Sequence, residues 1–209
     1  MQPNSSFQQA VAAFQRGDLT RSRALAEEAL SQAETVDLLH LIGLIECRSG
    51  RPDLGVDWLR RALQAEPNNL AFQVMLARAL ADSGRPADAL EVAEPPAGES
   101  PPELALWHIR AEAADVLQAW EESAQAWGRL GAARPGDWRA WSNRANALGE
   151  LGRWPEAAEA LKRAAEANPS KLPLRRALAS VRNPAAHGSL PPPRRRLCRC
   201  RPLCRQSSP

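Results

Sequence analysis

The sequence predicts an all-α protein, a right-handed superhelical solenoid of about five antiparallel helix hairpins followed by a capping helix. Proline recurs at one constant spacing: Pro67, Pro101, Pro135 and Pro169. Glycine keeps the same period at Gly50, Gly84 and Gly152, and only Gln118 breaks that series. A fixed period of about 34 residues is typical of arrays in which each unit buries its apolar face against the next. The units are expected near residues 3–35, 36–69, 70–103, 104–137 and 138–171, with the capping helix at 172–182.

The second unit shows the plan of helix, tight turn, helix and stop. Apolar residues between Leu38 and Ile45 form the stripe of a first helix, and Gly43 within it lets a second helix approach closely. Gly50 ends this helix because glycine tolerates a positive φ. Pro52 fits the first turn of the second helix, where a missing N–H costs nothing. Pro67 ends the unit, since proline cannot continue a helix.

Three units depart from this plan. The first is one residue shorter and is recognised by its apolar and turn residues: Phe7, Val11, Phe14, Gly17, Ala29 and Leu30. In the third, a helix of about two turns is predicted from Pro86 to near Glu94, because the four prolines and one glycine up to Pro102 exclude a helix. This break predicts thinner contacts between the third and fourth units. The fourth unit has Gln118 at its turn, which costs some local stability.

The last unit follows the repeat most closely. It has an aromatic residue at its fourth place, small residues at three places, glycine at the turn and proline at the end: Trp141, Ala145, Ala157, Ala164, Gly152 and Pro169. Small residues allow helix axes to come close, and large ones fill the space between hairpins. In these places the unit resembles the tetratricopeptide repeat. The resemblance implies an array that binds a partner in its concave groove.

Composition and charge limit the remaining possibilities. No apolar run approaches 18 residues, which excludes a transmembrane span, and the first residues lack the pattern of a secretory signal. The sequence therefore predicts a soluble, cytoplasmic protein, and its Arg- and Ala-rich, Lys-poor composition resembles that of GC-rich bacterial genes. Residues 1–171 hold 18 basic and all 24 acidic residues, whereas residues 172–209 hold nine arginines and no acid.

The chain divides into a repeat array, residues 1–182, and a basic tail, residues 183–209. The tail is rich in Pro, Arg and Cys and has no apolar period, which predicts disorder. Cys198, Cys200 and Cys204 carry thiolates that could bind zinc, but their spacing lacks the paired C-x2-C pattern. No metal or other cofactor is expected. The basic run could also contact polyanions without sequence specificity, so no specific nucleic-acid partner and no membrane are expected.

The sequence shows no catalytic constellation, so an enzyme is not expected. It has three histidines, of which His40 lies on an apolar helix face and His187 in the tail. His108, Glu112 and Asp115 share one helix face and could hold a metal, yet no further His or Cys is placed beside them. A polar groove surface is the alternative interpretation. There is no phosphate-binding glycine loop and no nucleophile motif.

The resemblance implies which side chains face the groove, because the first helix of each hairpin lines the concave side. The candidate groove residues are His40, Leu44, Cys47, Arg78, His108, Glu112, Arg139, Asn143 and Asn146. Asp82 and Asp115 also map to this face. Arg139, Asn143 and Asn146 are similar to the sets with which some family members bind a peptide carboxylate, although the preceding unit lacks matching basic residues. Alternatively, the two asparagines bond the neighbouring repeat.

The predicted function is a protein-interaction module that binds a peptide or a partner protein in the concave groove. The alternative is a regulatory or substrate-binding fragment of a bacterial transferase of the sulfotransferase or glycosyltransferase type. The abrupt change of composition at the tail could then reflect a shifted reading frame that removed a catalytic domain. Nucleic-acid binding through the tail ranks third. The partner and the oligomeric state are not predicted.

Overall fold

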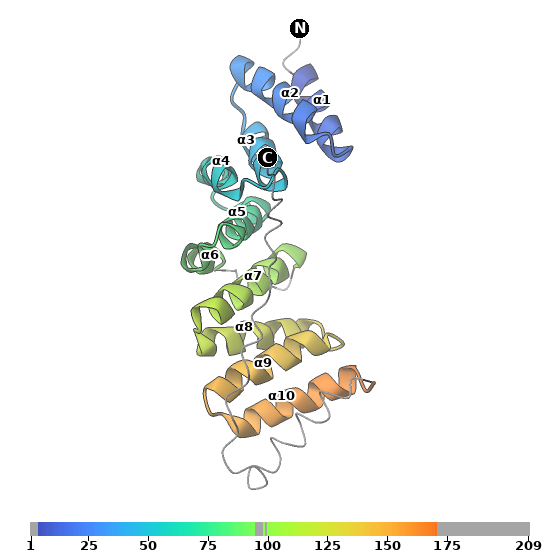
Figure 1. Ribbon diagram of the computed structural model, residues 1–209, viewed down its shortest axis with the longest axis vertical. Helices are drawn as coiled ribbons and strands as arrows, with labels where there is room; N and C mark the ends of the chain where they lie inside the picture. Colours follow the sequence, from blue (N-terminus) through green and yellow to red (C-terminus); the bar gives the residue numbers. More distant parts are fainter. Residues whose placement is uncertain (1–3, 95–97, 99, 171–209) are drawn as a thin grey trace, which may run out of the picture.

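The computed structural model describes residues 4–94, 98 and 100–170, so the expected capping helix and the basic tail lie outside the described residues. The described part consists of helices and turns without a strand, and the helices stack along one long axis (Figure 1). In chain order they are α1 (Asn4–Gln15), α2 (Leu19–Gln32), α3 (Val36–Arg48), α4 (Pro52–Ala65), α5 (Leu70–Asp82), α6 (Pro86–Val92), α7 (Pro101–Leu117), α8 (Trp120–Ala133), α9 (Trp138–Glu150) and α10 (Trp154–Ala167).

The helices pair into hairpins, α1 with α2 through to α9 with α10, which confirms the predicted all-α helical repeat. None of the described helices has both the length and the apolar character that a membrane span requires.

The turns inside the hairpins depend on one backbone conformation. Gly17, Gly50, Gly84 and Gly152 all have a positive φ, between 72° and 81°. At the same place in the fourth hairpin, Gln118 has φ 59° and ψ 27°. The prediction that a non-glycine residue makes this turn is confirmed, and Gln118 carries the backbone strain that glycine avoids elsewhere.

Three of the first helices begin with the same kind of cap. Thr35, Asn69 and Asp137 occupy the same place in their units and precede α3, α5 and α9. Each side chain accepts a hydrogen bond from a backbone N–H of the first turn. These bonds satisfy donors that have no partner within the helix. The residue at the same place in the fourth unit is Glu103, and there the structure differs.

Helix α7 begins at Pro101, inside the segment where a helix was excluded, so that exclusion was wrong for its last two residues. Pro101 and Pro102 occupy the first turn, the part of a helix that needs no intrahelical N–H. Glu103 accepts hydrogen bonds from the backbone N–H of Ser100 at 2.7 Å and of Gly98 at 3.1 Å, which fixes the entry of the chain into α7. The short helix α6 before it agrees with the prediction.

The predicted thinning of contacts between the third and fourth units is also wrong. Helix α7 packs against both α5 and α6. One buried cluster runs without a break from α4 to α7 and includes Val56, Leu80, Ala93, Leu106 and Ile109. The side chain of Gln73 donates to the carbonyl oxygens of Val92 and Glu94 and so satisfies the end of the shortened helix. The early start of α7 thereby compensates for the missing turns of α6.

Glycines set the closest helix approaches, as predicted for Gly43. A Cβ at Gly43 would lie 2.6 Å from the side chain of Leu59 on α4, and one at Gly55 would lie 2.5 Å from Sγ of Cys47 on α3. Gly131 on α8 makes the same kind of room for Trp141, whose ring lies 2.7 Å from the place of its missing Cβ. Pairs α3–α4 and α8–α9 are therefore held at distances that alanine would increase.

Candidate binding groove

The expected groove residues all lie on first helices, and side-chain contacts link α3 to α5 and α5 to α7. We use the name groove row for His40, Leu44, Cys47, Arg78, His108, Glu112, Arg139, Asn143 and Asn146. The ring of His40 on α3 lies 4.7 Å from the ring of Phe72 on α5. Arg78 on α5 pairs with Glu112 on α7, the residue at the same place in the next unit. Neighbouring first helices therefore meet through side chains of the row, and Arg78 and Glu112 meet from equivalent positions of successive units.

The α3 part of the row is half-buried and uncharged. Burial lowers the pKa of His40 below its ordinary value, although the carboxylate of Asp37 partly opposes this shift. Nε2 of His40 is buried without a hydrogen-bond partner among the described residues. Burial also raises the pKa of the Cys47 thiol, and the carboxylates of Asp82 and Glu46 add to that shift. His40 and Cys47 are both neutral near pH 7, and with half-buried Leu44 they form the least polar part of the row.

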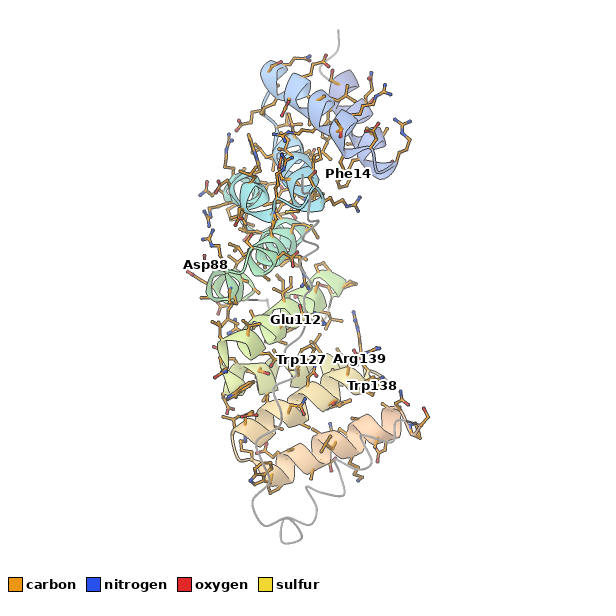
Figure 2. All side chains as sticks on the ribbon, in the orientation of Figure 1. Phe14, Asp88, Glu112, Trp127, Trp138 and Arg139 are labelled. Carbon is orange, nitrogen blue, oxygen red and sulfur yellow. The ribbon has the colours of Figure 1, made fainter. Side chains whose placement is uncertain are left out.

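The centre of the row is a group of three polar side chains from two helices. Nη1 of Arg78 donates to Oε2 of Glu112 at 2.9 Å, and Nδ1 of His108 lies 3.3 Å from the same oxygen. The hydrogen bond from His108 and the one from Arg78 lower the pKa of Glu112 to about 2, although burial opposes the shift. His108 also rests its ring edge-on against Trp127 of α8, with 5.3 Å between centroids. Figure 2 shows Glu112 partway along α7.

Asp82 lies near this group without joining it. Its carboxylate makes no hydrogen bond or close ion pair with any described residue, although the positive charge of Arg78 acts to lower its pKa. Burial raises the pKa of Asp82, and the neighbouring Glu112 carboxylate adds to the shift. A cationic group from outside would relieve both effects.

Asp115 does not behave as the mapping to the groove predicts. Its two oxygens accept hydrogen bonds from Ser123 Oγ and, at 3.0 Å, from Trp127 Nε1, both on α8. Burial raises the pKa of Asp115 despite these bonds. The carboxylate therefore joins α7 to α8 within one hairpin. It makes no hydrogen bond with His108 or Glu112. Among the described residues, no three His, Cys, Asp or Glu side chains are grouped to hold a metal ion.

The α9 part of the row stands apart from the centre. Arg139 is exposed, and its guanidinium lies 5.0 Å from the centre of the Trp138 ring (Figure 2). Asn143 is half-buried and Asn146 exposed. Neither amide hydrogen-bonds another residue of the described part, so bonding to the neighbouring repeat, the alternative for these two residues, is not observed there.

Arg144 on α9 has an unusual environment and was not among the predicted site residues. Its Nε is buried and has no hydrogen-bond partner among the described residues, and it borders two hollows between α8, α9 and α10. A signal was available in the sequence, because the positions one and two units earlier hold Arg110 and Leu76. Arginine at a repeat position that is apolar in earlier units indicates a buried guanidinium, whose partners the sequence does not identify.

The fold and the groove row define a class of helical-repeat proteins that act through interaction surfaces. Three tetratricopeptide-repeat family models match the chain, over residues 7–69, 48–113 and 138–171. The chain belongs to the tetratricopeptide-repeat family, and as such it is a repeat module for protein–protein interaction.

Solved structures of the same fold include YrrB, described as a TPR protein with an unusual peptide-binding site. It has a TM-score of 0.71 and 17% identity over 82% of this chain and 89% of its own. MamA has a TM-score of 0.68 and 17% identity, covering 80% of this chain and 97% of its own. A tetratricopeptide repeat protein from Parabacteroides merdae ATCC 43184 has a TM-score of 0.68 and 17% identity, covering 86% and 72%. No curated protein matches the chain.

Proposed function

We propose that the chain binds an extended peptide segment of a partner protein along the groove row, and that it acts by binding rather than by catalysis. The repeat array, residues 1–182, provides the surface, and the tail, residues 183–209, is not needed for it. The likeness to YrrB, with its described peptide-binding site, supports a peptide as the ligand. An extended peptide has unpaired backbone groups that amide side chains can bond.

The observation that carries this proposal is a pair of unpaired opposite charges on the first helices. The side chains of Asp82 on α5 and Arg139 on α9 form no hydrogen bond or ion pair with described residues, whereas the side chains of Arg78 and Glu112 are paired with each other. A peptide with a basic residue near α5 and an acidic group near α9 would pair both. Asn143 and Asn146 lie on the same helix as Arg139, and in this proposal their amides bond the backbone of the peptide.

The test begins with peptides selected from a random library against the full chain, followed by calorimetry on variants. Changing Arg139 and Asn146 together to alanine should weaken binding by about 1–3 kcal/mol, because charged and amide hydrogen bonds are then left unmade. Asp82→Asn should weaken the binding of peptides that carry a basic residue and leave the affinity of neutral peptides unchanged. Selected peptides are expected to share that basic residue.

The control changes Arg60 and Gln64, two residues of the second helix α4 outside the groove row, to alanine, and the affinity should not move. Deleting residues 184–209 should leave the affinity nearly unchanged, whereas attraction of the tail to polyanions should fall steeply with rising salt. A peptide that binds the groove variants as tightly as the wild type, or that is lost with the tail, contradicts the proposal.

A further inference from the structure

A row of equivalent positions on the first helices changes from apolar to basic along the array. Taken one unit after another, it holds Ile42, Leu76, Arg110 and Arg144. Ile42 and Leu76 are buried. The two arginines take the same place between hairpins, so each brings a guanidinium into a partly desolvated crevice.

Arg110 finds partners there because of the short helix α6. Its Nη1 donates to the carbonyl oxygen of Leu90 at 3.2 Å, and its Nη2 to Glu122 at 3.4 Å. Helix α6 ends at Val92, so the carbonyl of Leu90 has no intrahelical donor and is free to accept. The buried arginine and the helix end satisfy each other.

Arg144 makes neither of these two hydrogen bonds, although its charge still helps to lower the pKa of Glu156. Helix α8 continues to Ala133, so the carbonyl of Ala124, the residue equivalent to Leu90, is within the hydrogen-bonded helix. Glu156, equivalent to Glu122, instead accepts from Nε and Nη2 of Arg153 at 2.6 and 2.7 Å. Nε of Arg144 is left buried without a partner among the described residues. A buried donor in this condition destabilises the fold unless something occupies the site.

The space around Arg144 is open enough for a ligand. It borders a hollow of about 160 Å³ with Trp141 and Arg163, and a second of about 320 Å³ with Leu148 and Arg153. Gly128 on α8 keeps room for the guanidinium, because a Cβ there would lie 2.9 Å from Nη1 of Arg144. A glycine inside a helix is less stable than an alanine, so this room is made at some cost to α8.

We propose that Arg144 binds the carboxylate of a glutamate or aspartate side chain from a partner protein, in the hollows between α8, α9 and α10. The planar guanidinium matches a carboxylate with two parallel hydrogen bonds, and the ring of Trp141 provides a flat wall beside it. The positive and negative charges that line the hollows are equal in number: Arg144, Arg153, Arg163, Glu121, Glu156 and Glu159. A singly charged carboxylate therefore fits better than a phosphate, which three glutamates would repel. The hollows lie between α8, α9 and α10, and none of the residues that line them belongs to the groove row.

The test observes the Nε–H resonance of Arg144 in the ¹⁵N-labelled full chain, assigned by its loss in Arg144→Lys. The probes are the tripeptides acetyl-Gly-Glu-Gly-amide and acetyl-Gly-Gln-Gly-amide, and inorganic phosphate, at constant ionic strength. The glutamate tripeptide should shift the Arg144 resonance to saturation, and the glutamine tripeptide should bind at least about tenfold more weakly, the loss expected when a charged hydrogen bond is replaced by a neutral one.

Arg110 is the internal control, because its guanidinium is already bonded and its Nε–H resonance should stay in place. The proposal is overturned by an unsaturated response at Arg144, by equal binding of the two tripeptides, or by parallel shifts at Arg110 and Arg144. Tighter binding of phosphate than of the glutamate tripeptide would overturn the assignment to a carboxylate. The readout belongs to one side chain, so binding of probes to the basic tail does not affect it.

Discussion

Trp141 shows at the scale of a residue how one side chain joins three helices. Only 4% of its surface is exposed. Its ring fills the space left by Gly131 on α8, and the guanidinium of Arg163 on α10 lies 4.8 Å from its centre. The tetratricopeptide pattern predicted an aromatic residue packed at this place, and the structure shows why no smaller residue fills it.

Replacing Trp141 with alanine should lower the free energy of unfolding by roughly 3–5 kcal/mol, because a large packed ring is lost and a cavity remains. Chemical denaturation measures the change. Trp154→Ala is the matched control. Trp154 is 48% exposed, so its replacement should lower the free energy of unfolding much less. A loss below about 1 kcal/mol for Trp141→Ala would contradict the packing described here.

Glu112 makes a second prediction at this scale, which concerns pH. Its pKa of about 2 lies below its ordinary value of 4.5, so its interactions stabilise the fold fully above about pH 4.5 and are lost as the pH falls toward 2. Glu112→Gln should therefore destabilise the chain near pH 6, and the difference from wild type should shrink by pH 3. The side chain is 44% exposed, so solvent screening limits the effect to about 1 kcal/mol.

Denaturation of both chains across this pH range checks the prediction. Glu27→Gln serves as the control, because it breaks only an exposed i,i+4 pair with Arg23 and should cost about 0.5 kcal/mol or less. A Glu112→Gln difference that stays constant between pH 6 and pH 3 would show that the ion pairs of Glu112 do not stabilise the fold.

Helix α7 shows at the scale of an element what local sequence rules miss. The prolines before Glu103 predicted irregular chain, whereas the two nearest to it begin the helix. Which of several prolines starts a helix depends on the cap that Glu103 and Ser100 form, and on the packing of α7 against α5 and α6. The other end was predictable, because the glycine period by itself identifies Gln118 as the turn residue.

Gln118→Gly should stabilise the chain by about 1 kcal/mol, because glycine adopts a positive φ without the steric cost that glutamine has there. Thermal or chemical unfolding measures it. The control is Gln125→Gly in the exposed middle of α8, which should instead destabilise by about 1 kcal/mol. If both substitutions destabilise, the turn at Gln118 does not carry the strain its φ indicates.

At the scale of the whole molecule, the irregular third unit does not divide the array. The buried cluster from α4 to α7 crosses it, and Leu106 lies in the cluster with no exposed surface. The stability of a repeat array is approximately the sum of the intrinsic stability of each unit and the interface energy between neighbouring units. A buried cluster that spans two hairpins therefore couples their unfolding.

Leu106→Ala should therefore lower hydrogen-exchange protection in α5 and α6 as well as in α7, with a global loss of about 2–5 kcal/mol. Exchange measured by mass spectrometry resolves the three helices. Leu117→Ala, in the same helix but 40% exposed, should leave α5 and α6 unchanged. Loss of protection confined to α7 in Leu106→Ala would mean that the third and fourth units open independently.

The sequence alone determined the repeat, the hairpins and the turns, because each depends on local backbone chemistry that recurs in every unit. It also identified the polar positions that the first helices share. Only the tertiary structure decided how those positions are used. Asp115 bonds α8 rather than joining Glu112, and Arg110 is satisfied where Arg144 is not. These outcomes depend on which groups a neighbouring helix presents, and the ends of α6 and α8 differ although their places in the repeat are the same. A periodic pattern predicts where a side chain lies in the repeat. The partners of that side chain come from other helices, and its interactions differ between units where those helices differ in length or sequence.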